Sequence, residues 1–170
     1  MLEKWQGHQL VNLQKEVVGP IPKGILTAVS VAVAMEIDGR PRLVASLRAD
    51  YPVWEFAGGK VDAGEDSRQA AVREIKEELN LTIHQVEHAC SMLVLRKDKS
   101  YLMQFYVAKV APGSDCISRS EREIAATEYI NPDNDYLPAD RMWWPATVEA
   151  WWDIQQTVAK MFAPEPRAKG

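Results

Sequence analysis

Apolar residues of two sizes alternate between Ile25 and Ile37. Large or β-branched side chains occupy every second position, and mostly small ones lie between them, as in Val29-Ser30-Val31-Ala32-Val33-Ala34. Because successive side chains of a strand point to opposite faces, this pattern predicts one long strand that is covered on both sides.

Further strands are expected on either side of a central helix. Asp38-Gly39 is typical of a hairpin turn that leads into a second strand, Leu43 to Arg48. Val53 to Phe56 is expected to form a short third strand, followed by a glycine-bearing loop at residues 58–64. Later strands are predicted at about Cys90–Leu95, at Tyr101–Val110 and near Tyr129-Ile130.

Two helices are predicted from their ends and their apolar spacing. Asp66 can cap the first helix, with Gln69 in a capping-box position, and Asn80 suits the left-handed residue that ends it. Its apolar stripe is Ala71, Val72, Ile75 and Leu79. The second helix is expected to start at Pro145 and to carry an apolar series of Val148, Trp151, Trp152, Val158 and Phe162. Trp151 and Trp152 are expected in core packing or in a subunit contact.

These elements predict one α/β domain with an extension at each end. We expect residues 1–24 to form an N-terminal extension that adds either an edge strand or a dimer contact, so a homodimer is one option. The domain itself is expected at residues 25–162, and residues 163–170, with two prolines, are expected to form a disordered tail.

Composition excludes several classes of protein. The 170 residues are 46% apolar and 26% charged, as in a soluble globular domain. With 20 basic and 24 acidic residues, the net charge of −4 argues against a broad basic surface for nucleic acid or an anionic membrane. We find no stretch that would span a membrane and no signal peptide. Cys90 and Cys116 form neither a disulfide framework nor a zinc motif, which favours a cytoplasmic setting.

A group of carboxylates lies on the predicted first helix. Glu74, Glu77 and Glu78 stand at i, i+3 and i+4, so they share one helix face. Three glutamates on a solvated helix are common, so the spacing alone is also compatible with a solvent-exposed face that binds nothing. The functional alternative is a site for Mg²⁺ or Mn²⁺, which prefer several anionic oxygen ligands. Arg73 adjoins Glu74 and would hold one of these carboxylates in place.

The residues upstream complete a longer pattern. Gly59, Glu65 and the segment Arg73-Glu74-Ile75-Lys76-Glu77-Glu78-Leu79-Asn80-Leu81 are spaced as in the Nudix box, and eight of nine defined positions match. The sequence thus resembles the Nudix hydrolase family. Asn80 replaces the family's glycine and is the next residue most tolerant of a left-handed conformation. The resemblance implies an α/β/α sandwich with a mixed β-sheet between helices.

The resemblance also implies roles for individual residues. Glu74, Glu77 and Glu78 would bind Mg²⁺ or Mn²⁺, with the Gly59 carbonyl and Glu65 completing or supporting the metal shell. Arg73 would orient Glu74. Glu123 lies where family members often carry a general base, with Glu121 and Glu128 as competitors and a solvated loop glutamate as the plain alternative. The implied reaction is hydrolysis of a nucleoside diphosphate linked to a further group.

The segment from Trp54 to Val61 is similar to that of MutT-type nucleoside triphosphate pyrophosphohydrolases, with Ala57 in place of their proline. This likeness implies cleavage of a (deoxy)nucleoside triphosphate, including oxidised and guanine-type ones, to the monophosphate and pyrophosphate. Asp140 stands where those enzymes carry a base-reading asparagine, and a carboxylate would accept from guanine's two adjacent donors. Trp143 and Trp144 would stack on the base, and Arg48 and Lys60 would contact phosphate.

Each of these functional roles has a structural alternative. Asp140 would otherwise cap the segment that follows it or face water. Trp143 would pack under the last helix, and Arg48 and Lys60 would be surface residues. His84 and His88 are expected to be simple surface residues. Two further functions stay open: an ADP-ribose or nucleotide-sugar pyrophosphatase, and a non-catalytic module that senses a nucleotide. A sensor would have no need of the complete set of carboxylates.

Overall fold

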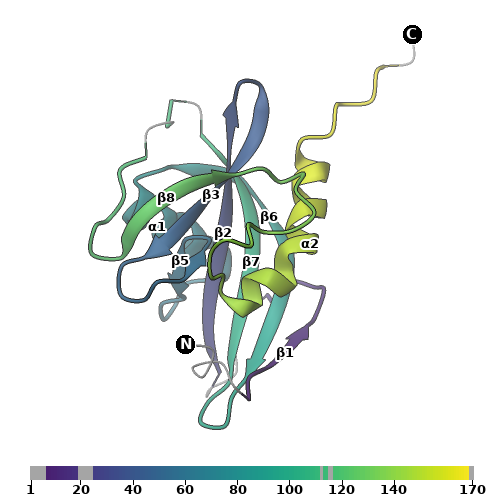
Figure 1. Ribbon diagram of the computed structural model, residues 1–170. Helices are drawn as coiled ribbons and strands as arrows, with labels where there is room; N and C mark the ends of the chain where they lie inside the picture. Colours follow the sequence, from purple (N-terminus) through teal and green to yellow (C-terminus); the bar gives the residue numbers. More distant parts are fainter. Residues whose placement is uncertain (1–6, 19–24, 112, 115–116, 169–170) are drawn as a thin grey trace.

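The computed structural model describes residues 7–18, 25–111, 113–114 and 117–168 (Figure 1). Cys116, the first six residues and residues 19–24 of the expected N-terminal extension lie outside this range. The chain forms strands and helices in the order β1 (Gln9–Asn12), β2 (Leu26–Ile37), β3 (Arg40–Arg48), β4 (Trp54–Glu55), β5 (Gly58–Lys60), α1 (Ser67–Leu79), β6 (Ile83–Leu95), β7 (Tyr101–Val110), β8 (Ile124–Ile130) and α2 (Pro145–Met161).

One mixed sheet connects all the strands. Its main order is β1-β6-β7-β2-β3-β4, with β5 paired to β2 and β8 paired to β3. The pairing of β2 with β7 is parallel, and every other pairing is antiparallel. β7 pairs along one edge of β2. Along the other edge, the first half of β2 pairs with β5 and its last four residues pair with β3. β5 and β3 therefore occupy different parts of the same edge of β2.

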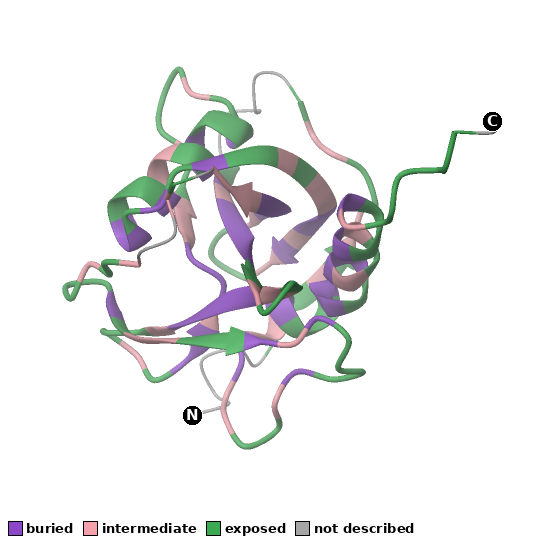
Figure 2. Cartoon of the chain, turned by 90° about the horizontal axis from the view of Figure 1, so that it is seen from above, coloured by how far each residue is buried: buried purple, intermediate pink, exposed green. Residues whose placement is uncertain are grey.

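The two faces of β2 belong to two separate cores, as the alternation predicts. Val29, Val31 and Val33 face the core that contains the buried residues of α1. Ala32 and Ala34 face the core under α2, where their small side chains leave room for the large rings of Trp54, Phe56, Phe105, Trp143 and Trp151. Figure 2 shows the buried positions of both helices turned toward the sheet. The predicted α/β/α sandwich is confirmed.

Helix α1 has the ends that the sequence predicts. The Asp66 side chain accepts from the Gln69 backbone N–H, and the Gln69 side chain accepts from the Asp66 N–H, so the capping box is complete. Asn80 ends the helix with φ +54°. The prediction for one residue of the apolar stripe was wrong. Val72 is 41% exposed, and Ala70 is buried in the core instead.

Helix α2 begins at Pro145 as predicted, and Trp151 and Val158 are buried. Val148 and Trp152 instead face outward, at 52% and 65% exposure. The consecutive pair Trp151-Trp152 cannot lie on one helix face, so only one ring reaches the core.

Several strands are longer than predicted. β6 begins at Ile83 and β8 at Ile124, and an extra short strand, β5, forms inside the glycine-bearing loop. The added parts of β6 and β8 are largely exposed or half-buried, so their sequences lack the apolar alternation on which the prediction relied.

The described part of the N-terminal extension is bound to the domain. β1 is the edge strand beside β6. Beyond β1, the backbone N–H and C=O of Val17 are both bonded to the fully buried side chain of Gln104 on β7. Residues 163–168 are exposed, form neither helix nor strand, and lead away from the body of the protein (Figure 1). No helix among the described residues is long and apolar enough to cross a membrane.

Candidate functional site

Two glycines bring β5 against the carboxylate face of α1. A Cβ atom at Gly58 would overlap the carbonyl oxygen of Val29, and one at Gly59 would overlap the carboxylate of Glu74. Gly58 also donates its backbone N–H to Glu78 Oε2 at 3.1 Å. The absence of side chains at Gly58 and Gly59 therefore lets the backbone of β5 lie directly beside two glutamates of α1.

Arg73 connects the predicted acidic residues to one another. Its guanidinium donates to both oxygens of Glu65 at 2.9 Å and to Glu74 Oε1 at 2.9 Å. It also donates to Glu77 Oε2 at 3.2 Å and to the carbonyl oxygen of Lys60 at 3.0 Å. Glu65 in turn accepts from the backbone N–H of Asp62, and Arg73 holds the pKa of Glu65 below its usual range. Arg73 thus ties α1 to the loop that precedes it.

Glu74 and Glu78 are shielded from water. The side chain of Glu74 is 12% exposed, and Glu78 is 8% exposed. Burial, together with the negative charges of Glu74 and Glu123, raises the pKa of Glu78 to about 8. Burial also raises the pKa of Glu74, although Arg73 opposes this shift. Glu77 is more open, with its side chain 56% exposed.

Glu123 is brought to this cluster by a loop that docks on the end of α1. The backbone N–H groups of Ser118 and Ser120 donate to the carbonyl oxygens of Leu79 and Glu78, which have no partner within the helix. Glu123 follows on the same loop and is exposed. Its charge acts on both Glu74 and Glu78, so it lies within electrostatic range of them.

The donor set suits a hard divalent cation. Glu74, Glu77 and Glu78 offer only carboxylate oxygens, and Gly59 offers a backbone carbonyl, which are the ligands that Mg²⁺ and Mn²⁺ prefer. Burial and the negative charges of Glu74 and Glu123 raise the pKa of Glu78, so a bound cation would favour its ionised form. Among the described residues, no three acidic, histidine or cysteine side chains converge closely enough to enclose an ion, and Arg73 holds Glu65, Glu74 and Glu77 instead.

Replacing Arg73 tests its positioning role. We expect Arg73→Lys to lower kcat by about 10- to 100-fold, since a lysine ammonium cannot bind several carboxylates in fixed geometry. The matched control is Arg40→Lys in the exposed β2–β3 hairpin. Unchanged kcat in Arg73→Lys, measured at saturating substrate and Mg²⁺, would contradict the role.

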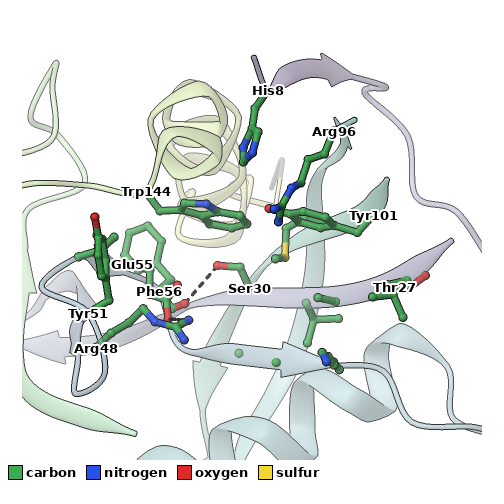
Figure 3. A pocket seen from close by; sticks show the side chains of 18 of the residues that line it. His8, Thr27, Ser30, Arg48, Tyr51, Glu55, Phe56, Arg96, Tyr101 and Trp144 are labelled. Carbon is green, nitrogen blue, oxygen red and sulfur yellow. Dashed lines mark hydrogen bonds and ion pairs between the residues drawn. The ribbon is translucent and has the colours of Figure 1, made fainter. Parts of the chain in front are cut away.

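A cavity of about 340 Å³ opens beside the acidic cluster and shares Gly58 and Gly59 with it. Arg48 and Lys60, both predicted to contact substrate, line this cavity. Figure 3 shows Arg48 and Glu55 at one end and His8 and Arg96 at the other, with the Trp144 ring between them. Arg48 is held by Asp50 at 2.8 Å and by Glu55 at 3.3 Å.

The structure places the two tryptophans that were expected to stack on a base in different surroundings. Trp143 is 8% exposed, packs against Trp54 and Phe56, and donates from Nε1 to the carbonyl oxygen of Pro138. Its ring therefore has no free face for a base, and the expectation for Trp143 is corrected. The next residue, Trp144, lines the cavity and stacks on Tyr101, with ring centroids 6.3 Å apart and planes 7° apart.

The two tryptophans should respond differently to truncation. We expect Trp143→Ala to lower the free energy of unfolding by about 3–5 kcal/mol, because it leaves a large void in the core. Trp144→Ala should unfold at a similar denaturant concentration to the unmodified protein and bind nucleotide at least about fivefold more weakly. Urea unfolding and nucleotide titration measure both effects. Equal loss of stability in the two variants would contradict the placement of Trp143 in the core and of Trp144 at the cavity.

Asp140 is also placed away from the cavity. Its side chain is 73% exposed and pairs with Arg141. Arg141 also pairs with Glu128 and lies over the Trp54 ring, so Asp140 is part of a surface ion-pair group. Asp140 does not line the cavity, which favours the alternative that it faces water, and its role in reading the base stays a prediction.

Glu55 is a cavity residue that the sequence did not single out. Burial raises the pKa of Glu55 to about 7, despite the opposing effect of Arg48. Since this folded-state pKa is above the unfolded value, its stabilising contribution is complete in acid and is lost as the pH rises from about 4.5 through about 7. We therefore expect Glu55→Gln to reduce the fall in metal-free melting temperature between pH 5 and pH 8. An identical pH profile in both proteins would contradict this.

Sequence reasoning missed His8, Arg96 and Tyr101, which also line the cavity. His8 and Arg96 carry no motif that marks them. Only the strand pairing of β1 with β6 brings them to one place. His84 is exposed as expected, whereas His88 is half-buried and bonded to Ser91.

A family model and several curated proteins match the sequence of this chain. The NUDIX domain model matches residues 26–152. A CTP pyrophosphohydrolase of Escherichia coli is 43% identical over 63 residues, which are 36% of this chain and 47% of that protein. An asymmetrical bis(5'-nucleosyl)-tetraphosphatase of Caenorhabditis elegans is 41% identical over 71 residues, 38% of this chain and 51% of that protein. The chain thus spans about half the length of these curated relatives.

Solved structures share the whole domain. A C. elegans Ap4A hydrolase complex has a TM-score of 0.61 at 26% identity, and covers 80% of this chain and 99% of its own. A MutT NUDIX hydrolase from Burkholderia pseudomallei has a TM-score of 0.60 at 23% identity, with coverage of 75% and 98%. The family model matches well over half of the chain, and the fold and the spacing of the acidic residues agree with it. The chain belongs to the Nudix family.

Proposed function

We propose that this protein is a metal-dependent pyrophosphohydrolase that cleaves a (deoxy)nucleoside triphosphate to the monophosphate and pyrophosphate. The observation that carries the proposal is the shared wall of Gly58 and Gly59. Their backbone lies against Glu74 and Glu78 on one side and lines an aromatic cavity on the other. A nucleotide in the cavity would therefore extend its phosphates past these glycines toward the carboxylates.

Glu74, Glu77, Glu78 and the Gly59 carbonyl would hold Mg²⁺ or Mn²⁺, with Glu65 supporting them through Arg73. The bound metal would neutralise phosphate charge and make the attacking water more acidic. Arg48 and Lys60 would bind phosphate oxygens at the cavity wall. Glu123, whose charge acts on Glu74 and Glu78, would accept the proton of the water as the water oxygen bonds to phosphorus. The phosphoanhydride bond then breaks, and the departing phosphate group takes the bridging oxygen.

One relative favours a second substrate. The likeness to an asymmetrical bis(5'-nucleosyl)-tetraphosphatase raises the question of a dinucleoside polyphosphate, although Tyr101 lies a few residues later than the tyrosine typical of such enzymes. The stacked Tyr101 and Trp144 rings would suit either substrate, because every base has a π-face. ADP-ribose and nucleotide sugars complete the set to be tested.

The test is a substrate panel with Mg²⁺, scored for both products. It should contain the (d)NTPs, oxidised (d)NTPs, a dinucleoside tetraphosphate, ADP-ribose and nucleotide sugars. We expect pyrophosphate and a monophosphate from at least one triphosphate, with the highest kcat/KM in the panel. A higher kcat/KM for the tetraphosphate or for ADP-ribose would overturn the triphosphate assignment. Binding without any turnover would favour a sensor and overturn the enzyme assignment.

A further inference from the structure

The far end of the cavity contains a residue from outside the matched domain. His8 precedes β1, whereas the family model begins at residue 26. His8 lines the cavity together with Arg96, Tyr101 and Trp144 (Figure 3). The N-terminal segment therefore contributes a wall of the cavity that the Nudix domain alone does not provide.

Strand register explains why His8 lies beside Arg96. In the antiparallel pairing of β1 with β6, Gln9 is opposite Leu95. The preceding residue on one chain and the following residue on the other are His8 and Arg96, so continuing the register sets them across from each other. Their charges interact: burial and then the nearby Arg96 guanidinium lower the pKa of His8. A neutral imidazole can donate from one ring nitrogen and accept at the other.

Two polar atoms of the cavity have no hydrogen-bond partner among the described residues. Arg96 Nε is buried and makes no hydrogen bond, although it lies at an ion-pair distance of 3.4 Å from Asp98 Oδ1. Thr27 Oγ1 is also buried and unbonded, and Thr27 lines the same cavity. Buried polar groups are nearly always bonded in native proteins, so the unbonded Thr27 Oγ1 and the weakly paired Arg96 Nε favour a polar ligand in this cavity.

The shape of this end suits a planar ligand. The Tyr101 and Trp144 rings are nearly parallel, and Trp144 also contacts the Phe105 ring at 6.4 Å between centroids. These rings provide a flat aromatic wall, and Arg96 provides donors at its edge. A nucleobase combines a π-face with hydrogen-bonding groups in its plane, which matches both features.

We propose that His8 and Arg96 form the subsite that reads the base, and that they select a base with two adjacent acceptors, as guanine offers at O6 and N7. This inference rests on the proposed nucleotide substrate. A guanidinium only donates, so it pairs with the two guanine acceptors. Adenine places an N6 amino group next to N7, which would set a donor against a donor. The N-terminal segment is then a specificity element of the enzyme.

Binding of nucleoside monophosphates without metal tests the subsite apart from catalysis. Titration of GMP and AMP, followed by tryptophan fluorescence, should show tighter binding of GMP to the unmodified protein. Arg96→Ala should weaken GMP binding by about 5- to 100-fold and abolish the preference for GMP over AMP. His8→Ala should reduce the preference by about threefold or more. Arg40→Ala and His84→Ala, both exposed and outside the cavity, are the matched controls.

Arg96→Lys distinguishes base reading from phosphate binding. If Arg96 reads the base, lysine should not restore the preference for GMP, because a single ammonium does not reproduce the bidentate fork. Equal rescue of GMP and AMP binding by lysine would show that Arg96 binds phosphate and would overturn the proposal. An unchanged GMP-to-AMP ratio in both alanine variants would also overturn it. Neither result depends on turnover, so failure of the hydrolase assignment in the substrate panel is a separate outcome.

Discussion

Glu78→Gln is expected to lower kcat/KM with Mg²⁺ by about 10³-fold or more, because it removes one anionic ligand of the metal. The fold should be kept. Glutamine has the same shape, and its carbonyl oxygen can still accept from the Gly58 N–H that now bonds to Glu78. Burial and the charges of Glu74 and Glu123 disfavour the ionised form of Glu78, and glutamine is uncharged at every pH. Melting temperature without metal should therefore be equal or higher, while turnover is lost.

Steady-state kinetics and thermal melting, measured on the same preparation, separate these effects. Glu36→Gln is the matched control, because Glu36 is exposed at the β2–β3 hairpin. Turnover within tenfold of the unmodified protein in Glu78→Gln would remove Glu78 from the metal site. A large fall in melting temperature would mean that the carboxylate is structural.

Gly59→Ala is expected to have the second-largest effect, at about 10²-fold or more in kcat/KM. The added methyl group would occupy the position of the Glu74 carboxylate, which must then turn away. Glu74 is a flexible side chain, so the backbone can remain in place and the loss should appear in activity rather than in folding. Metal-dependent kinetics, with circular dichroism to check the fold, measure the effect.

Gly58→Ala provides the contrast at the next position. Its methyl group would overlap the backbone of Val29, which cannot turn away without breaking the pairing of β5 with β2. We expect a loss of about 3 kcal/mol or more in the free energy of unfolding, measured by urea titration. If Gly59→Ala proved the more destabilising of the two, the close approach of β5 to α1 would have to be reinterpreted.

Local sequence signals predicted the parts of the fold that local physics controls. Asp66 with Gln69 and Asn80 marked the two ends of α1 because capping depends on neighbouring residues only. The alternation along β2 predicted two covered faces because side chains of a strand must point both ways. The spacing of Glu74, Glu77 and Glu78 follows from helix geometry, so the acidic face could also be predicted.

The errors came where distant segments decide the outcome. Trp143 and Trp144 are adjacent and equally aromatic, and only the hydrogen bonds of this segment to Trp54 determine which ring enters the core. Asp140 belongs through Arg141 to an ion-pair group with Glu128 of β8, a contact that its neighbours in sequence do not show. His8 and Arg96 are 88 residues apart and meet only through strand pairing, which no local pattern shows.

Direct metal binding tests the central claim that the face of α1 beside Gly59 holds the catalytic cation. Titration of Mn²⁺ into the 170-residue protein, followed by the electron paramagnetic resonance signal of free Mn²⁺, counts bound ions without reference to activity. The unmodified protein should remove Mn²⁺ from solution, and a variant with Glu74, Glu77 and Glu78 all changed to glutamine should not. Equal Mn²⁺ binding by the two proteins would contradict the assignment.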